Sequence, residues 1–589
     1  MHHAIRRNDI ALRRQRLLFR HISRPWERSS YMKTVRLLSA CALLLFAASI
    51  AASGARVTSV AMVWRVPAPQ SADPGVQAVE AGITALGELN AQLKAFAAHP
   101  GARATLAFDP AYVAALERLA SGSSALQDLA DAHLGAADPR AAELLDDLSQ
   151  RVVVDSARAE TSAGKRFTSY ATAARLALNG NGAARFSTRD LVDFTGTAIA
   201  LTLASSGTAP SEQQLLKKNH LDARDLRAVS DDFSRAAQDV LTELKAAVQS
   251  GSIELAALPA YEPIVPLIVD AAARTRSEAN TVDLSARSDA AAAIEDGART
   301  ASALGGGSDP GIVSPHGAYD DETASLMQER HPAYALFSDR VAKATTGASA
   351  EAVSASQAAA LHGYLLETSR TSKLPILFCS DTLSATLDVL PATTSPSALG
   401  ERVRGMASDA LAASSANDPT VLVLCLDLES PLLHRADRGS LLGYLAAVLS
   451  SANGIEATTP KLFLRRHPPT VETYGFEPGS DAGGFALWMG SANQASLWTA
   501  LLEARKSAGG DAALTHAAVR DSLLRAESNR WFMALQLPQP RQAVQRTLSQ
   551  YRSAIAQVYR AANVPVPADI APIKWDHSAT IATPPGRRV

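Results

Sequence analysis

The chain has 589 residues, of which 47% are hydrophobic and 20% are charged, so it can bury a large core and is long enough for two or more domains. Residues 1–55 carry ten Lys and Arg against two Asp and Glu, so the remainder has 47 basic and 56 acidic side chains, a formal charge of −9. This acidic balance argues against nucleic acid and against an anionic membrane surface as partners.

The N-terminus has the pattern of an export signal. A positively charged segment, Met32–Arg36, precedes an apolar stretch, Leu37–Ala52, and the small residues Ser53–Ala55 follow. The apolar stretch is shorter than the roughly 20 residues of a membrane-spanning helix. We therefore predict a cleaved signal peptide over residues 32–55, a secreted or periplasmic protein and no stable membrane span, with an uncleaved anchor as the alternative. Residues 1–31 are interpreted as an over-extended gene start.

The rest of the chain alternates strand-like and helical segments. Apolar runs predict strands, and segments with helical periodicity predict helices, among them Val76–Ala98, Asp222–Gln249 and Ala290–Leu304. Such alternation favours an α/β barrel over an open sheet. The expected strands are Val57–Val66, Ala102–Phe108, Thr197–Leu203, Ile253–Leu255, Ile312–Val313, Ala335–Phe337, Leu374–Cys379 and Val421–Leu426.

Strand signals become rare after residue 468, where Gly484–Met489 is the last apolar run of this kind. The segments Ala495–Lys506, Ala512–Glu527 and Gln542–Ala562 have helical periodicity. We therefore predict a barrel over residues 56–468 and a helical domain over residues 469–589.

Polar residues follow several of the expected strands. The strand after Gly251 leads into a proline-containing loop with Tyr261 and Glu262, and the strand at Leu374–Cys379 leads into Asp381. Barrel enzymes carry their sites on the loops at the carboxyl ends of the strands, so we expect these side chains to form one site. No glycine-rich phosphate loop follows a strand, which argues against a nucleotide cofactor. We expect no cofactor.

Six segments, taken together and in order, resemble the motifs of glycoside hydrolase family 57, the retaining enzymes that act on α-glucans. The resemblance extends from Val60 to Pro572 and implies a distorted (β/α)7 TIM-like barrel followed by a helical C-terminal domain. The segments are Gly251–Leu267 (GSIELAALPAYEPIVPL), Gly311–Gly317 (GIVSPHG), Leu377–Ser384 (LFCSDTLS), Asp427–Ser430 (DLES), Leu487–Arg505 and Arg525–Phe532.

The resemblance places the catalytic pair at His316 and Asp381. Retaining glycosidases use two carboxyl groups about 5–5.5 Å apart, a nucleophile and an acid/base. The acid/base aspartate falls on Asp381, but the nucleophile glutamate falls on His316, whose imidazole cannot form the usual glycosyl ester. The His-x-His-Gln-Pro motif of the family falls on Arg65–Pro69, where only the proline matches, and the histidine of its Tyr-His-Pro motif is Glu262.

Several candidate site residues have a structural alternative. Asp381 is suited to capping a helix that begins near Thr382, and a buried Glu254 would need a pairing partner. Asp320 and its acidic neighbours are expected to begin a helix, and His316 is also consistent with a turn histidine. We expect the following residues to bind substrate: Glu254, Tyr261, Glu262, Asp427 and Glu429.

Metal binding and disulfide bonding have weak signals. No second histidine stands at ligand spacing from His316, so we expect no metal site. Cys379 and Cys425 lie in strand-like runs and are expected to be buried free thiols, with a disulfide as the alternative. Trp488, Trp498 and Trp531 are expected in the core.

Two functions are compatible with this sequence. The first is an exported, non-catalytic protein that binds an α-glucan-like oligo- or polysaccharide, or a protein partner. The second is an active retaining α-glucan hydrolase or transglycosidase, with Asp381 as acid/base and a relocated carboxylate nucleophile such as Glu262 or Asp320. We favour the first, because several positions around the nucleophile are lost together.

Overall fold

The computed structural model describes residues 58–568 and 570, except for 179–185, 208–211, 275–281, 346–359, 392, 414–418, 452–453 and 536–540. The predicted signal peptide lies outside the described residues. The residues from Val57 onward form one compact unit, so the boundary expected between residues 468 and 469 stays a prediction. None of the described helices is both long enough and apolar enough to span a bilayer.

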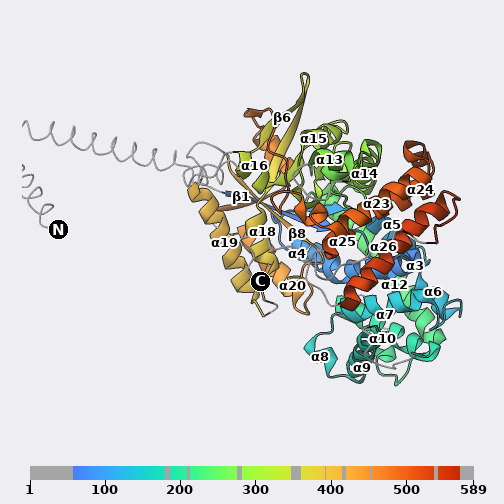
Figure 1. Ribbon diagram of the computed structural model, residues 1–589. Helices are drawn as coiled ribbons and strands as arrows, with labels where there is room; N and C mark the ends of the chain where they lie inside the picture. The colour runs from blue at the N-terminus through green and yellow to red at the C-terminus, as the bar shows by residue number, and fades with distance from the viewer. Residues whose placement is uncertain are drawn as a thin grey trace, which may run out of the picture. The chain divides into compact units, whose positions relative to one another are not determined.

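Seven parallel strands in the described part of the chain close into a barrel, and helices surround the strands in Figure 1. They are hydrogen-bonded in the order β8-β1-β2-β3-β4-β5-β7, and β7 pairs again with β8. This confirms the predicted (β/α)7 barrel. The strands are β1 (Thr58–Val66), β2 (Ala104–Phe108), β3 (Ile253–Ala257), β4 (Gly311–Val313), β5 (Ala335–Ser338), β7 (Ser372–Cys379) and β8 (Val421–Asp427).

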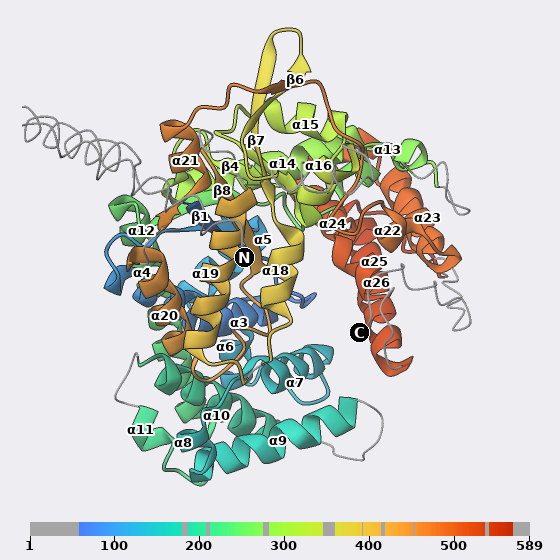
Figure 2. The same cartoon turned by 90° about the vertical axis from the view of Figure 1, so that its left-hand side faces the viewer.

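Three further strands extend the sheet. β6 (Tyr364–Ser369) forms an antiparallel hairpin with β7, and this hairpin projects beyond the helices in Figure 2. β10 (Glu472–Thr473) pairs with β6, and β9 (Ile455–Thr458) pairs with the first half of β1. The sequence did not predict these short strands, because two to six residues carry little periodicity.

A helical lobe fills the connection between β2 and β3 and lies below the barrel in Figure 2. Its longest member, α12, begins with a capping box at Asp222 and ends at Gly251, whose φ of 73° suits glycine at a helix end. Both limits agree with the prediction. The helices are α5 (Pro110–Ala120), α6 (Ala125–Ala130), α7 (Pro139–Arg151), α8 (Ser156–Ala159), α9 (Ser162–Leu178), α10 (Thr188–Ser206), α11 (Glu212–Leu215) and α12 (Ala223–Ser250).

The strand expected at Thr197–Leu203 is wrong, because these residues lie in α10. Every residue of this helix from Leu191 to Leu203 is buried. An apolar run that is buried on all sides has no polar face, so its periodicity does not distinguish a helix from a strand.

The remaining helices surround the barrel or follow it. The three predicted C-terminal helices are present, whereas the run Gly484–Met489 forms a short helix rather than a strand. The helices are α3 (Pro74–Thr84), α4 (Asn90–Ala98), α13 (Val265–Arg274), α14 (Arg287–Ala301), α15 (Asp321–Gln328), α16 (Asp339–Thr345), α18 (Asp381–Asp388), α19 (Pro396–Ala413), α20 (Arg438–Ser451), α21 (Pro460–Arg466), α22 (Ala486–Met489), α23 (Ala492–Ser507), α24 (Ala517–Ala526), α25 (Asn529–Ala534) and α26 (Arg541–Ala561), with a π-helical turn, η1 (Ala85–Leu89), between α3 and α4.

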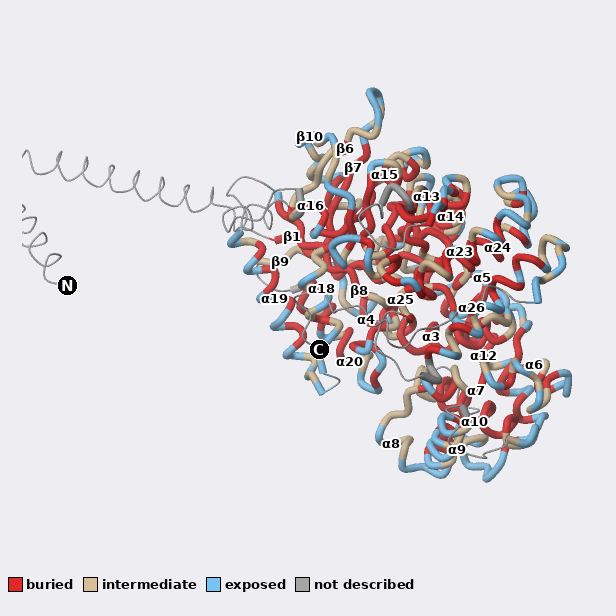
Figure 3. Tube along the Cα trace, in the orientation of Figure 1, coloured by how far each residue is buried: buried red, intermediate tan, exposed pale blue. Residues whose placement is uncertain are grey.

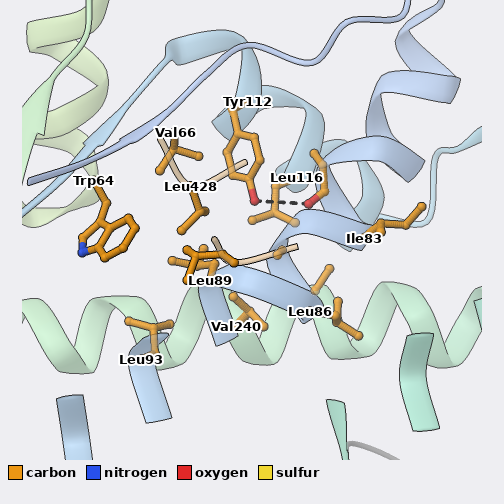
Figure 4. Packing of buried hydrophobic residues seen from close by; sticks show 14 of the residues in the cluster. Trp64, Val66, Ile83, Leu86, Leu89, Leu93, Tyr112, Leu116, Val240 and Leu428 are labelled. Atoms are coloured by element: carbon orange, nitrogen blue, oxygen red, sulfur yellow. Dashed lines mark hydrogen bonds between the residues drawn. The ribbon is translucent and has the colours of Figure 1, made fainter. Parts of the chain in front are cut away.

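The two faces of β1 show how the core is divided. Trp64 and Val66 face outward and pack with Leu89, Leu93 and Val240 of the surrounding helices (Figure 4). The alternate residues of β1, Ala61 and Val63, face the barrel interior, as expected from the two-residue period of a strand. In Figure 3 the strands are mostly coloured as buried, and the helices alternate between buried and exposed residues. As expected, Trp488, Trp498 and Trp531 are buried.

A disulfide joins Cys379 at the end of β7 to Cys425 of β8. The expectation of two free thiols is therefore wrong. The strands β7 and β8 are far apart in sequence and become neighbours only when the barrel closes, so the spacing of the cysteines did not reveal the bond.

Candidate functional site

Six polar side chains, here called the mouth cluster, interact at the carboxyl ends of the barrel strands. Each comes from the end of a strand, from a loop or, for Asp381, from the first turn of α18, and they are linked by hydrogen bonds or by electrostatic interactions. They are Arg65, Glu262, His316, Asp381, Asp427 and Asp481.

Arg65 and Asp427 form the cationic centre of the mouth cluster. They are direct partners in the register of β1 and β8, so their side chains leave the same face of the sheet. Arg65 donates from Nε to Oδ1 of Asp427 at 2.8 Å and from Nη2 to Oδ2 at 3.1 Å. Burial opposes the charge of Arg65, but Asp427, Glu262 and Asp481 together raise its pKa. The positive charge of one guanidinium thus offsets the negative charges of several carboxylates.

The surroundings of Asp381 favour its protonated form. Its Oδ2 accepts a hydrogen bond from the hydroxyl of Ser338, and its backbone N–H points to Oδ1 of Asp339 at 3.4 Å. Burial, and then the charges of Asp339 and Asp481, raise the pKa of Asp381 to about 8. Ser380 is the N-cap residue of α18, so Asp381 lies in the first turn and does not cap the helix. A carboxyl group with this pKa is suited to general-acid chemistry at neutral pH.

His316 is fixed by two hydrogen-bond partners. Nδ1 lies 3.0 Å from Oδ2 of Asp481, and Nε2 lies 3.2 Å from Oδ1 of Asn529. Asn529 uses its amide N–H to donate to the carbonyl of Glu262, so its oxygen faces the imidazole. Both ring nitrogens therefore face acceptors, which is the arrangement of a protonated imidazolium. Burial lowers the pKa of His316. The negative charge of Asp481 and the hydrogen bond to it raise this pKa by more, so the net shift is upward.

The backbone around these side chains is strained. Tyr261, Glu262 and His316 have φ values of 60°, 50° and 53°, which residues with a side chain rarely adopt. Such conformations concentrate at functional sites, where the surrounding contacts hold them.

Burial, and then the charge of Asp427, raise the pKa of Glu262 to about 7. The positive charges of Arg65 and His316 act in the opposite direction.

Comparison with known proteins agrees with this geometry. The model of glycosyl hydrolase family 57 matches residues 158–474, more than half of the 589 residues. The chain belongs to glycosyl hydrolase family 57. No curated protein sequence matches the chain.

Two solved structures of family 57 have a similar fold. The branching enzyme from the hyperthermophilic archaeon Thermococcus kodakaraensis, solved with glucose, is 13% identical with a TM-score of 0.50, covering 86% of this chain and 88% of that chain. The branching enzyme from Pyrococcus horikoshii is 13% identical with a TM-score of 0.51, covering 86% of this chain and 90% of that chain. At this identity the similarity shows the shared fold alone.

Three of the residues expected to bind substrate lie outside the mouth cluster. Glu254 is near the amino end of β3, where it accepts hydrogen bonds from the hydroxyl of Tyr334 and the backbone of Lys461, which supports its structural alternative. The hydroxyl of Tyr261 donates to Asp521 in the C-terminal helices. Glu429 is turned to Arg151 of the helical lobe. Asp320, a candidate nucleophile, is the buried N-cap of α15.

The sequence reasoning missed Asp481 and Asn529 and did not assign Arg65 a role. Asp481 and Asn529 are 165 and 213 residues away from His316 in sequence, so no local spacing connects them. Arg65 did carry a signal, because it is a charged residue near the end of an otherwise apolar strand. Within the described ranges, no three His, Cys, Asp or Glu side chains are grouped so that they would hold a metal ion.

The pKa of Asp381 predicts a pH-dependent stability. Between the ordinary carboxyl value of 3.8 and about 8, the folded protein holds a proton that the unfolded chain releases. Asp381 therefore lowers stability progressively as the pH rises through this window. We expect Asp381→Asn to match the melting temperature of the native protein near pH 4 and to exceed it increasingly up to pH 8. A melting temperature lowered equally at all pH values would contradict this prediction and indicate a structural role.

Proposed function

We propose that this family 57 protein is exported and binds an α-glucan-like saccharide at the mouth cluster, without the usual retaining mechanism. The observation that carries the proposal is the hydrogen bonding of His316 to Asp481 and Asn529, at the position where the sequence resemblance places the family's nucleophile. The transition state of glycoside cleavage resembles an oxocarbenium ion, with positive charge at the anomeric carbon. A fixed cation at the nucleophile position repels that charge, where a carboxylate would stabilise it.

The mouth cluster is chemically suited to a saccharide. Carboxylates accept hydrogen bonds from sugar hydroxyls, and the guanidinium of Arg65 donates them. These groups come from six different parts of the barrel rim, so they can orient a ligand from several sides. The α-glucan class is supported by membership of the family.

Export is supported by two independent observations. Residues 32–55 have the order of a signal peptide: a basic start, an apolar stretch and small residues. The Cys379–Cys425 disulfide agrees with an oxidising compartment such as the periplasm, because cytosolic proteins of mesophiles seldom keep such bonds.

One observation favours catalytic turnover as a second function. Asp381 and Asp481 interact electrostatically, and their pKa values move in opposite directions. Burial acts to raise the pKa of Asp481, but the charge of His316 and its hydrogen bond lower it overall. A protonated and an ionised carboxyl group in one site are the pair that acid-assisted glycoside cleavage needs. In this function Asp381 is the acid, and Asp481 is the relocated carboxylate.

The decisive experiment measures turnover and binding on the same protein, residues 56–589. We expect no release of reducing ends from maltoheptaose or amylose, and measurable binding of maltoheptaose by calorimetry. Asp381→Asn should bind with a Kd within about threefold of the native value, because an amide replaces a protonated acid of the same shape. Turnover that is lost in Asp381→Asn would establish the second function. The absence of both turnover and binding would refute the proposal and direct the search to protein partners.

A further inference from the structure

A second polar site lies where the helical lobe meets the loop after β8. It is a cavity of about 270 Å³. The residues that line it come from the β1–α3 loop, α3, η1, α7, the β8–α20 loop and α26. Glu429 connects it to the mouth cluster, because it stands two residues after Asp427. Six acidic residues line this cavity: Glu80, Glu88, Glu143, Asp146, Asp147 and Glu429.

A single arginine, Arg151, faces these six acids from the cavity wall. It forms ion pairs with Glu80 at 2.5 Å, with Asp147 at 2.6 Å and with Glu429 at 2.6 Å. Asp146 is paired with Arg546 behind the wall, and Glu143 accepts hydrogen bonds from the side chain of Ser71 and the backbone of Ala72. The acidic side chains that line the cavity therefore outnumber the cationic ones.

Glu88 is the least satisfied of these carboxyl groups. Its side chain is only 8% exposed, yet it accepts no hydrogen bond from another described residue. Its nearest cationic atoms are Nη1 of Arg438 at 3.8 Å and Nδ1 of His434 at 4.0 Å. Glu88 lies in the π-helical turn η1, a type of distortion that is frequent at functional sites.

A second buried acceptor in the same cavity lacks a partner. Oδ2 of Asp147 is buried without a hydrogen bond among the described residues, although Oδ1 is paired with Arg151. Buried carboxylate oxygens are costly unless a donor satisfies them. Two under-satisfied carboxyl groups in the lining of one cavity indicate that a donor from a ligand completes the site.

We propose that this cavity binds the protonated amino group of an amino-sugar unit. An ammonium group offers three charged hydrogen-bond donors, and donors are what Glu88 and Oδ2 of Asp147 lack. Neutral side chains in the wall, among them Thr84, Gln150 and Gln550, can bond the hydroxyls of the same sugar. The inference rests on the proposed function only for the claim that a saccharide carries the ammonium group. Most carboxylate oxygens here are already engaged, which disfavours a divalent cation, since that ion needs six or more free oxygens.

Binding of the ammonium group should displace a proton from Glu88. Burial, and then the charge of Glu429, raise the pKa of Glu88 to about 7, while Arg438 and Arg151 act against them. A cation beside the carboxyl group favours its ionised form. The charged or titratable groups that face Glu88 are Tyr112 of α5, Arg151 of α7, Glu429 and His434 of the β8–α20 loop, and Arg438 of α20.

The test is calorimetric titration of residues 56–589 with glucosamine and with glucose at about pH 6, in two buffers of different ionisation enthalpy. We expect glucosamine to bind at least about tenfold more tightly than glucose. It should release close to one proton per ligand, because a group with a pKa near 7 is mostly protonated at this pH. Glu88→Gln should lose about tenfold in glucosamine affinity and the proton that Glu88 releases. The matched control Glu117→Gln, at an exposed position of α5, should behave as the native protein.

Each other outcome is also decisive. Equal affinity for glucosamine and glucose, or unchanged glucosamine binding in a folded Glu88→Gln variant, would overturn the inference. Competition by Ca²⁺ or Mg²⁺ that depends on Glu88 would show a metal site instead and would also overturn it. Maltoheptaose binding, measured in parallel, tests the proposed function separately. Glucosamine binding without maltoheptaose binding would refute the proposed function and leave the cavity assignment standing.

Discussion

Replacing Arg65 by methionine is expected to abolish saccharide binding at the mouth cluster and to cost about 2–3 kcal/mol of the free energy of unfolding. Removing one partner from a buried ion pair costs about 3–5 kcal/mol, because the other charge stays buried without compensation. We expect less here, since 45% of the Asp427 side chain is exposed and solvent screens part of its charge. Glu262 and Asp481 lose the same counter-charge, so the loss is larger than that of a surface pair.

Two controls separate the charge effect from a packing effect. The double variant Arg65→Met/Asp427→Leu removes both charges and should recover most of the stability but not the binding. Lowering the pH from 7 to 5 should narrow the stability gap between Arg65→Met and the native protein, because the uncompensated Glu262 takes up a proton. Chemical denaturation and maltoheptaose calorimetry measure both effects. Native-like binding by the single variant would exclude the mouth cluster as the saccharide site.

The framework of the fold could be predicted because its signals are local. A capping residue at Asp222 and a glycine at Gly251 delimit α12, and the apolar runs of β7 and β8 stand out from their surroundings. Thr197–Leu203 was wrongly predicted as a strand because such a local signal is missing. These residues lie in a stretch of α10 that is buried on all sides, so its sequence shows no 3.6-residue alternation of apolar and polar residues. Prediction therefore succeeded where an element has one polar face or a distinct end.

The candidate site could be predicted only in part, because it depends on which chain segments meet. The order of polar residues after strands pointed to Glu262 and Asp381, the family resemblance added His316, and these three lie with Asp427 in the mouth cluster. Glu254 lies near the start of β3, so the strand presents it to the opposite end of the barrel from a residue at its end. The charge state of His316 is set by Asp481, and no pattern in the sequence connects the two.

Removing the disulfide is expected to cost about 4 kcal/mol of the free energy of unfolding. Cys379 and Cys425 are 46 residues apart, and closing a loop of this length in the unfolded chain accounts for roughly that amount. The bond also acts at the seam of the barrel. There β7 and β8 share one register pair, Cys379 with Val423, and the backbone N–H of Ser380 donates to the carbonyl of Val423 at 2.8 Å. β8 ends in Asp427, and α18, which follows β7, begins with Asp381, so a loosened seam should also weaken saccharide binding.

The measurement compares the native protein with Cys379→Ala/Cys425→Ala in equilibrium denaturation, with and without a reductant. The reductant should lower the stability of the native protein to that of the double variant and leave the variant unchanged. The native protein is its own control, because the same reductant acts on both samples and only one contains the bond. If the native protein is insensitive to reductant and yields two titratable thiols on unfolding, the cysteines are free as the sequence first indicated. In that case the disulfide gives no support for export, which then rests on the signal-peptide pattern alone.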